Sequence, residues 1–124
     1  MKRTIAFCSA VIFIFAWLAG CTNDKIAYIH IYEMESFQKP KPDSLQVITY
    51  TSDIALFSSA IKGAKRNAGI ADMADPQYKV DIGEEAYFLW LTEQAGTIEN
   101  VKDTHTTYSL SKESAKDIFR LLSK

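Results

Sequence analysis

Beyond residue 25 the chain opens with the pattern of a β-hairpin. Residues 26–35 (IAYIHIYEME) are rich in Ile and Tyr, which favour strands. Both faces of this strand carry apolar or aromatic side chains: Ala27, Ile29 and Ile31 on one, and Tyr28, His30 and Tyr32 on the other. Pro40 and Pro42 predict a turn over residues 37–44, because proline cannot donate a ladder hydrogen bond. Residues 45–51 (LQVITYT) predict the partner strand.

The next segment changes to a helical period. Apolar residues recur at spacings of three and four, at Ile54, Phe57, Ala60, Ile61 and Ala64. We expect Ser52 to be the N-cap, with Asp53 in the first turn, where the helix dipole favours a carboxylate. Gly69 is the expected end of this helix.

The second half returns to strands and closes on a helix. Residues 78–82 alternate, and Gly83-Glu84 reads as a tight connection to residues 85–92 (EAYFLWLT), the most apolar strand and the expected centre of the sheet. Residues 96–101 and 106–110 predict a further hairpin.

Ser111 is the expected cap of a last helix, whose apolar positions are Ala115, Ile118, Phe119 and Leu122. The element order is ββα-βββ(β)-α. It predicts an α+β fold with a mainly antiparallel sheet of about five strands and two helices.

Residues 1–20 have the order of a secretory signal peptide. Lys2 and Arg3 precede an apolar run over residues 5–17, and small residues follow. The closing Leu18-Ala19-Gly20-Cys21 resembles the lipobox of bacterial lipoproteins. The resemblance implies cleavage before Cys21, a lipid on its sulfur, and a new amino group that can be acylated. Two alternatives stay open: an uncleaved transmembrane helix, although about 20 apolar residues are usual, and an ordinary cleaved signal.

This processing changes the composition of the chain. Cleavage removes 20 of the 124 residues and leaves 104, with residues 21–25 as lipidated cysteine and short tether and residues 26–124 as a single domain. Losing Lys2 and Arg3 moves the formal charge from −1 to −3. Because basic residues are neither in excess nor clustered, no nucleic-acid partner is expected.

The mature domain has no free thiol. Cys8 leaves with the signal peptide and Cys21 carries lipid, and the chain has two cysteines in all. A disulfide, a cysteine-ligated metal and a thiol nucleophile are therefore excluded. His30 and His105 lie far apart without metal-ligand spacing, and the adjacent Glu84 and Glu85 face opposite sides of a strand. We expect neither an enzyme nor a cofactor.

The loop around residues 70–76 (IADMADP) carries an alternative function. Asp72 and Asp75 could serve a small-ligand or metal-binding carrier, although the closing Glu of a calcium loop is missing. Asp75 before Pro76 also suits a turn stabilised by local hydrogen bonds. Ile70 and Met73 predict that this loop folds back on the core.

Aromatic residues supply the candidate partner-binding surface, namely Tyr28, His30, Tyr32, Phe88 and Trp90. If both helices cover one side of the sheet, one aromatic set forms an open surface of the kind found at partner sites. Cover from residues 67–77, or helices on both faces, would instead bury both sets, and a small domain without disulfides needs most of its aromatic residues inside. Both alternatives remain.

Three segments resemble the small YhfM-like lipoproteins of Gram-positive bacilli. They are residues 69–78 (GIADMADPQY), 87–91 (YFLWL) and 104–108 (THTTY), together with the lipobox. The resemblance implies a lipoprotein on the outer side of the cell membrane. That family is uncharacterised, so it implies no activity and no functional residue beyond Cys21.

Taken together, these patterns predict a non-catalytic binding module. The domain is expected to be held at the extracytoplasmic face of the cell membrane by the lipid on Cys21, where it binds an envelope or membrane protein.

Overall fold

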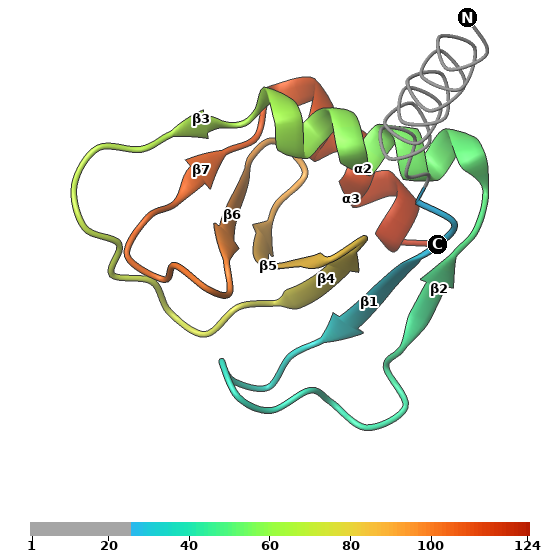
Figure 1. The fold of residues 1–124 in the computed structure, drawn as a ribbon, viewed down its shortest axis with the longest axis horizontal. Coiled ribbons are helices and arrows are strands. Elements are labelled where there is room, and N and C mark those ends of the chain that lie inside the picture. Colours follow the sequence, from blue (N-terminus) through green and yellow to red (C-terminus); the bar gives the residue numbers. More distant parts are fainter. Residues whose placement is uncertain (1–25) are drawn as a thin grey trace, which may run out of the picture.

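A seven-stranded sheet with two helices against one face makes up the described part of the chain, residues 26–124, in the computed structural model (Figure 1). The predicted signal peptide (1–20) and the lipidated cysteine with its tether (21–25) lie outside the described residues. The elements are β1 (Ile29–Glu33), β2 (Gln46–Ile48), α2 (Thr51–Gly63), β3 (Lys65–Arg66), β4 (Tyr78–Ile82), β5 (Glu85–Leu91), β6 (Gly96–Asn100), β7 (Tyr108–Ser109) and α3 (Lys112–Leu122).

The strands follow the order β2-β1-β4-β5-β6-β7-β3, and each neighbouring pair is antiparallel. This confirms the α+β class. It also confirms β5 as the central strand and the pairing of β1 with β2 and of β6 with β7. The sheet has seven strands where about five were expected, and β3 is the strand that the sequence pattern did not indicate.

The turn between β4 and β5 has the expected length of two residues. Gly83 at its first position has φ 62°, which a type II′ hairpin turn requires and which glycine adopts without strain. The positive φ matches the right-handed twist of the flanking strands, so the turn fixes the register of Ile82 opposite Glu85.

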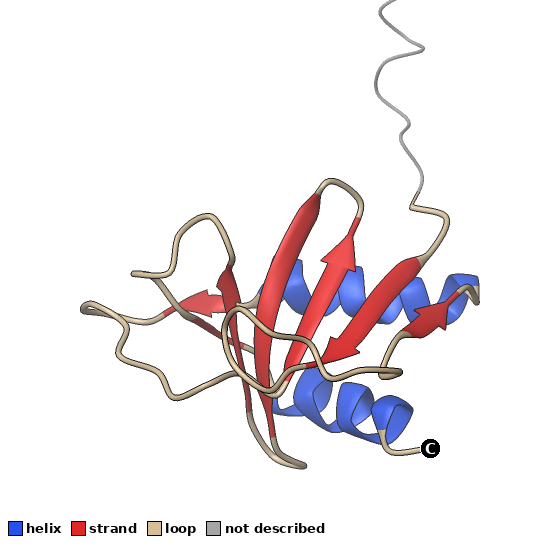
Figure 2. Cartoon of the chain, turned by 90° about the horizontal axis from the view of Figure 1, so that it is seen from below, coloured by secondary structure: helices blue, strands red, loops and turns tan. Residues whose placement is uncertain are grey.

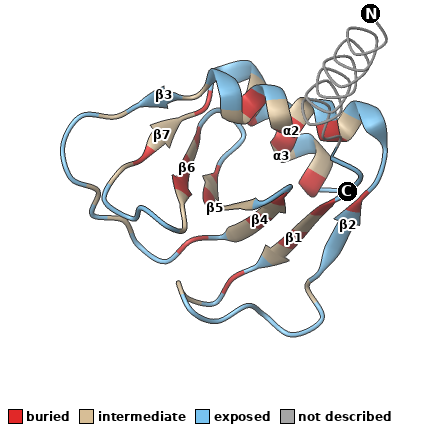
Figure 3. Cartoon of the chain, in the orientation of Figure 1, coloured by how far each residue is buried: buried red, intermediate tan, exposed pale blue. Residues whose placement is uncertain are grey.

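One face of the sheet meets the two helices and forms the core. The register puts Ile31, Val80 and Tyr87 side by side on this face, and Leu89 beside Ile98. The buried helix residues that pack on them are Ile54, Phe57, Ala60, Ala115, Ile118 and Leu122. Both helices therefore cover the same face, while loops cross the other one (Figure 2), and the buried positions concentrate between helices and strands (Figure 3).

The first helix differs from the prediction at both ends. Tyr50 is its N-cap and makes no side-chain cap bond, so the expectation of Ser52 as the cap is wrong by two residues. The helix ends at Gly63, and Gly69 lies in the following loop with φ 85°. At the N-terminal end, the Tyr50 carbonyl already accepts the first helical hydrogen bond, from the N–H of Ile54 at 3.0 Å. At the C-terminal end the cause is tertiary: Ala64 turns to an extended conformation, and Lys65 and Arg66 pair with β7 instead of continuing the helix.

The last helix begins as expected. The Ser111 hydroxyl accepts a hydrogen bond of 3.1 Å from the backbone N–H of Ser114, which satisfies one of the free donors of the first turn. Neither helix in residues 26–124 is long and apolar enough to span a membrane.

Candidate functional site

The helix-free face of the sheet collects every candidate partner-binding residue. Residues on this face alternate with the core positions, and the register aligns them in rows across the strands. One row is Val47, His30, Asp81 and Ala86; the next is Tyr32, Lys79, Phe88 and Glu99; Trp90 and Thr97 follow. Tyr28 joins the first row because its ring centroid lies 4.7 Å from that of His30.

The half of this face over β1 and β2 is open. Tyr28 is 53% exposed and Val47 52% exposed. His30 is half-buried between two tyrosines, with a ring-centroid distance of 6.5 Å to Tyr32. We call Tyr28, His30, Tyr32 and Val47 the open aromatic surface.

A hollow of about 810 Å³ adjoins the open aromatic surface and reaches Ile26, Asp81 and Glu84. One carboxylate oxygen of Asp81 is buried there and accepts no hydrogen bond from residues 26–124. The ammonium group of Lys79 lies 3.7 Å from that oxygen. This ion pair gives Asp81 a partner of its own on the sheet.

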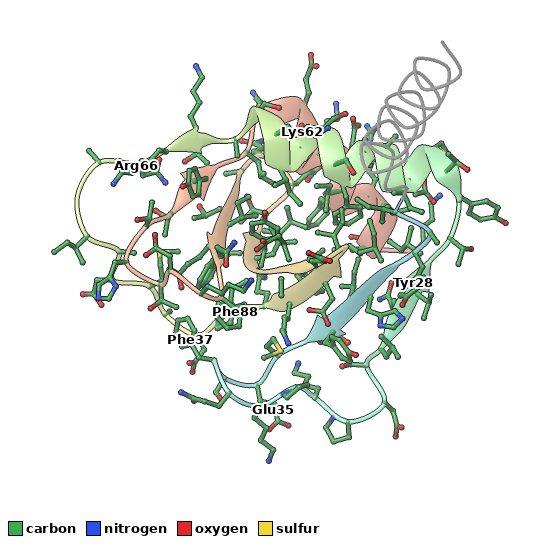
Figure 4. The ribbon with its side chains drawn as sticks, in the orientation of Figure 1. Tyr28, Glu35, Phe37, Lys62, Arg66 and Phe88 are labelled. Carbon is green, nitrogen blue, oxygen red and sulfur yellow. The ribbon has the colours of Figure 1, made fainter. Side chains whose placement is uncertain are left out.

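The half over β5 and β6 is covered by loops. Phe88 is buried beneath Phe37 from the loop after β1, at a centroid distance of 5.3 Å and nearly perpendicular rings (Figure 4). Phe37 also lies 6.1 Å from the ring of Trp90. The Trp90 indole N–H donates a 3.0 Å hydrogen bond to the carbonyl of Ala74. The two aromatic sets thus share one face, and loops rather than helices divide it into an open and a covered half.

The first part of the loop of residues 67–77 is hydrogen-bonded to residues 105–109. The backbone N–H of Asn67 donates to the Thr107 carbonyl, and that of Ala71 donates to the His105 carbonyl, both at 2.9 Å. The side chain of Asn67 adds bonds to Thr107 and Ser109 at 3.0 and 2.8 Å.

This anchoring decides where the apolar and acidic residues of the loop lie. Met73 and Asp72 line a cavity on the sheet, whereas Ile70 is 81% exposed and Asp75 is exposed outside the cavity. The expectation that Ile70 folds back on the core is therefore wrong. The bond from Ala71 to His105 fixes the chain just after Ile70 and leaves this side chain in solvent.

The cavity itself measures about 430 Å³ and lies between β5, β6 and three loops. Its lining residues are Phe37, Gln38, Ala71, Asp72, Met73, Phe88, Glu99, Val101 and Thr104. Its size falls within the roughly 300–1,000 Å³ of small-molecule sites. We call it the sheet-face cavity.

Glu99 is the most unusual residue of the sheet-face cavity, because only 1% of it is exposed. Burial raises the pKa of its carboxyl above the usual value of 4.5, the nearby carboxylate of Asp103 raises this pKa further, and His105 opposes the change. A site with a perturbed carboxyl group in a cavity has the physical character of a functional site.

Sequence reasoning did not single out Glu99 or Phe37. Alternation along residues 96–100 puts Glu99 opposite to the core position Ile98, which predicts a solvent-facing acid. It is buried beside residues 37–38 and 71–73, which are remote in the sequence, and residues 101–104, which directly follow β6. The sequence contained one usable signal, the expected cover from residues 67–77.

The acidic and histidine side chains do not assemble a metal centre. Among residues 26–124 no three His, Cys, Asp or Glu side chains lie close enough together to hold a metal ion. His30 and His105 lie apart, one on the open aromatic surface and one in an exposed turn after β6.

The fold and the site together define a small α+β domain with helices on one face of an antiparallel sheet and a loop-covered cavity on the other. The chain belongs to the YhfM family, because the sequence model of that family, described as YhfM protein, matches residues 28–124. No curated protein and no solved structure matches the chain.

Proposed function

We propose that this chain is a lipid-anchored extracytoplasmic binding module that catalyses no reaction and binds through the helix-free face of its sheet. One observation carries the proposal: that face presents an open aromatic surface beside a cavity with a buried carboxyl group. Exposed aromatic surface and a concave pocket that contains a group with a perturbed pKa are usual marks of binding sites.

The anchor is supported by the sequence Leu18-Ala19-Gly20-Cys21 after a basic and apolar N-terminus. Two acyl chains hold a protein stably at a membrane, whereas one chain does so marginally. The test is mass spectrometry of the N-terminus together with cell fractionation. We expect a chain that starts at a lipidated Cys21 in the membrane fraction, and Cys21→Ser should leave the precursor uncleaved and unlipidated. An unmodified Cys21 in the wild-type protein would contradict the anchor.

The binding face is tested by photo-crosslinking in intact cells. A photoreactive residue at Tyr28 sits on the open aromatic surface, and one at Lys116 sits on the exposed side of α3, behind the sheet. We expect a specific adduct with an envelope or membrane protein at position 28 and none at position 116. Equal adducts at both positions, or none at position 28, would contradict binding through this surface.

A second candidate is a small-ligand carrier, and the sheet-face cavity favours it. A carrier that uses the 70–76 loop needs an acidic side chain from this loop in the cavity. Asp72 lines the cavity, whereas Asp75 does not. The two candidates are compatible, because they use different halves of the same face.

A further inference from the structure

Glu99 is a buried acid whose carboxyl group is not hydrogen-bonded to any side chain or backbone group within residues 26–124. None of the side-chain hydrogen bonds and ion pairs formed among residues 26–124 includes its carboxylate oxygens, although the neighbouring Asn100 and Asp103 are both bonded. A buried charge is costly unless it is paired and hydrogen-bonded. A cation that enters the sheet-face cavity would supply the missing partner.

The charged residues in the lining of the sheet-face cavity are acidic. Two carboxylates, Glu99 and Asp72, belong to its lining, and among residues 26–124 no lysine or arginine does. Asp103 adds negative charge near Glu99 and raises its pKa, whereas His105 lowers this pKa. Lys79 lies on the same face beside the lining residue Phe88, two strands from Glu99, and its ammonium group is 3.7 Å from Asp81. The field in the cavity therefore favours a positively charged ligand.

Apart from the polar Gln38 and Thr104, the remaining residues of the lining are apolar or aromatic. Phe37 and Phe88 contribute rings, and Met73 and Val101 contribute aliphatic surface. Aromatic rings attract ammonium groups, and they do so more strongly where water is excluded. This combination suits an ammonium group that carries carbon substituents better than it suits a bare metal ion.

We propose that the sheet-face cavity binds a small organic ammonium compound, whose positive charge pairs with the carboxylate of Glu99 and packs against Phe37 and Phe88. The inference rests on the proposed function, since it names the ligand class of the same binding face.

The proposal includes a pH dependence. Choline keeps its charge at every pH, so any change in its affinity belongs to the protein. Protonation of Glu99 removes the counter-charge, and affinity should fall as the pH drops through the raised pKa of this group. His105, Asp72, Asp103 and Lys79 are the other charged or titratable side chains near this region. Comparison with Glu99→Gln separates the contribution of Glu99 from theirs.

The experiment is calorimetric titration of the purified full-length lipoprotein, in a neutral detergent at about pH 8, where carboxyl groups are ionised. The probes are choline and its neutral isostere, in which carbon replaces the ammonium nitrogen. We expect choline to bind at least about tenfold more tightly than the isostere, and Glu99→Gln to remove that preference. Glu93→Gln, an exposed acid in the turn after β5, is the matched control and should bind choline as the wild type does.

Three results would overturn the inference: equal binding of choline and the isostere, unchanged choline affinity in Glu99→Gln, or no choline binding by the wild-type protein. The comparison of the two probes needs no variant, so a folding defect cannot obscure it. Each of these results leaves the anchor and the crosslink at position 28 intact, whereas failure of those tests removes the proposed function itself.

Discussion

Glu99 on β6 and Phe88 on β5 are cross-strand neighbours on the helix-free face of the sheet. Both are buried, although no helix covers this face. Phe37 covers Phe88, and the loops around residues 71–73 and 101–104 surround Glu99. The apolar residue gains from this burial and the acid pays a desolvation cost. A residue kept at such a cost is a candidate for function.

Replacing Glu99 by Gln should change how stability depends on pH. The carboxyl pKa is raised in the folded state by burial and by Asp103, so the folded protein holds the proton more tightly than the unfolded chain does. The wild type should therefore gain stability as the pH falls from above the raised pKa toward about 4.5, relative to Glu99→Gln. At neutral pH the variant should be the more stable protein.

Urea unfolding of both proteins across this pH range gives the difference in the free energy of unfolding. Effects of the other acids cancel in that difference. A pH-independent difference, or a wild type that is favoured at neutral rather than at acid pH, would show that Glu99 is not desolvated in the folded protein.

The observed helix and strand boundaries show which sequence patterns predicted the elements correctly. Alternation in residues 78–82 and 85–91, and the serine at position 111, predicted β4, β5 and the start of α3, because these signals are local. Gly69 misled at the C-terminal end of α2, because the pairing of Lys65 and Arg66 with β7 is a contact across more than 40 positions of sequence. No local pattern reports such a contact.

The two serines at the helix starts form a matched pair. Ser111→Ala should lower the free energy of unfolding by about 1 kcal/mol, because it removes the hydroxyl that accepts from Ser114. Ser52→Ala should change it by less than about 0.5 kcal/mol, since Ser52 is exposed inside α2 and caps nothing. Urea unfolding measures both. A larger loss at Ser52 than at Ser111 would contradict the helix boundaries.

Two glycines offer a second pair. A Cβ at Gly96 would lie 2.7 Å from a methyl carbon of Leu110 and 3.4 Å from one of Leu91, so Gly96→Ala should cost about 1–3 kcal/mol through overpacking. A Cβ at Gly63 meets nothing within 4 Å, and Gly63→Ala should leave stability unchanged or raise it by up to about 1 kcal/mol. Thermal unfolding distinguishes them. Equal effects would mean that β6 does not approach Leu110 so closely.

On the scale of the whole molecule, one sheet face packs against both helices to form the core, and we propose that the helix-free face binds a partner. The sequence predicted the α+β class. It also predicted that Tyr28 shares a strand face with Tyr32 and Phe88 with Trp90, because side chains alternate between the two faces along each strand. It left open whether these aromatics were covered. The answer depends on Phe37 and residues 67–77 folding over β5 and β6, which only the assembled structure reveals.

Site-specific labelling in intact cells tests most directly whether this face binds a ligand outside the membrane. Thr104→Cys places a thiol at the sheet-face cavity, and Lys116→Cys places one on the exposed side of α3. The account predicts that a membrane-impermeant maleimide labels both variants on intact cells and does not label the wild type. Added choline should slow labelling at position 104 and leave position 116 unchanged. Labelling only after cell lysis, or choline protection that is absent or equal at both positions, would contradict it.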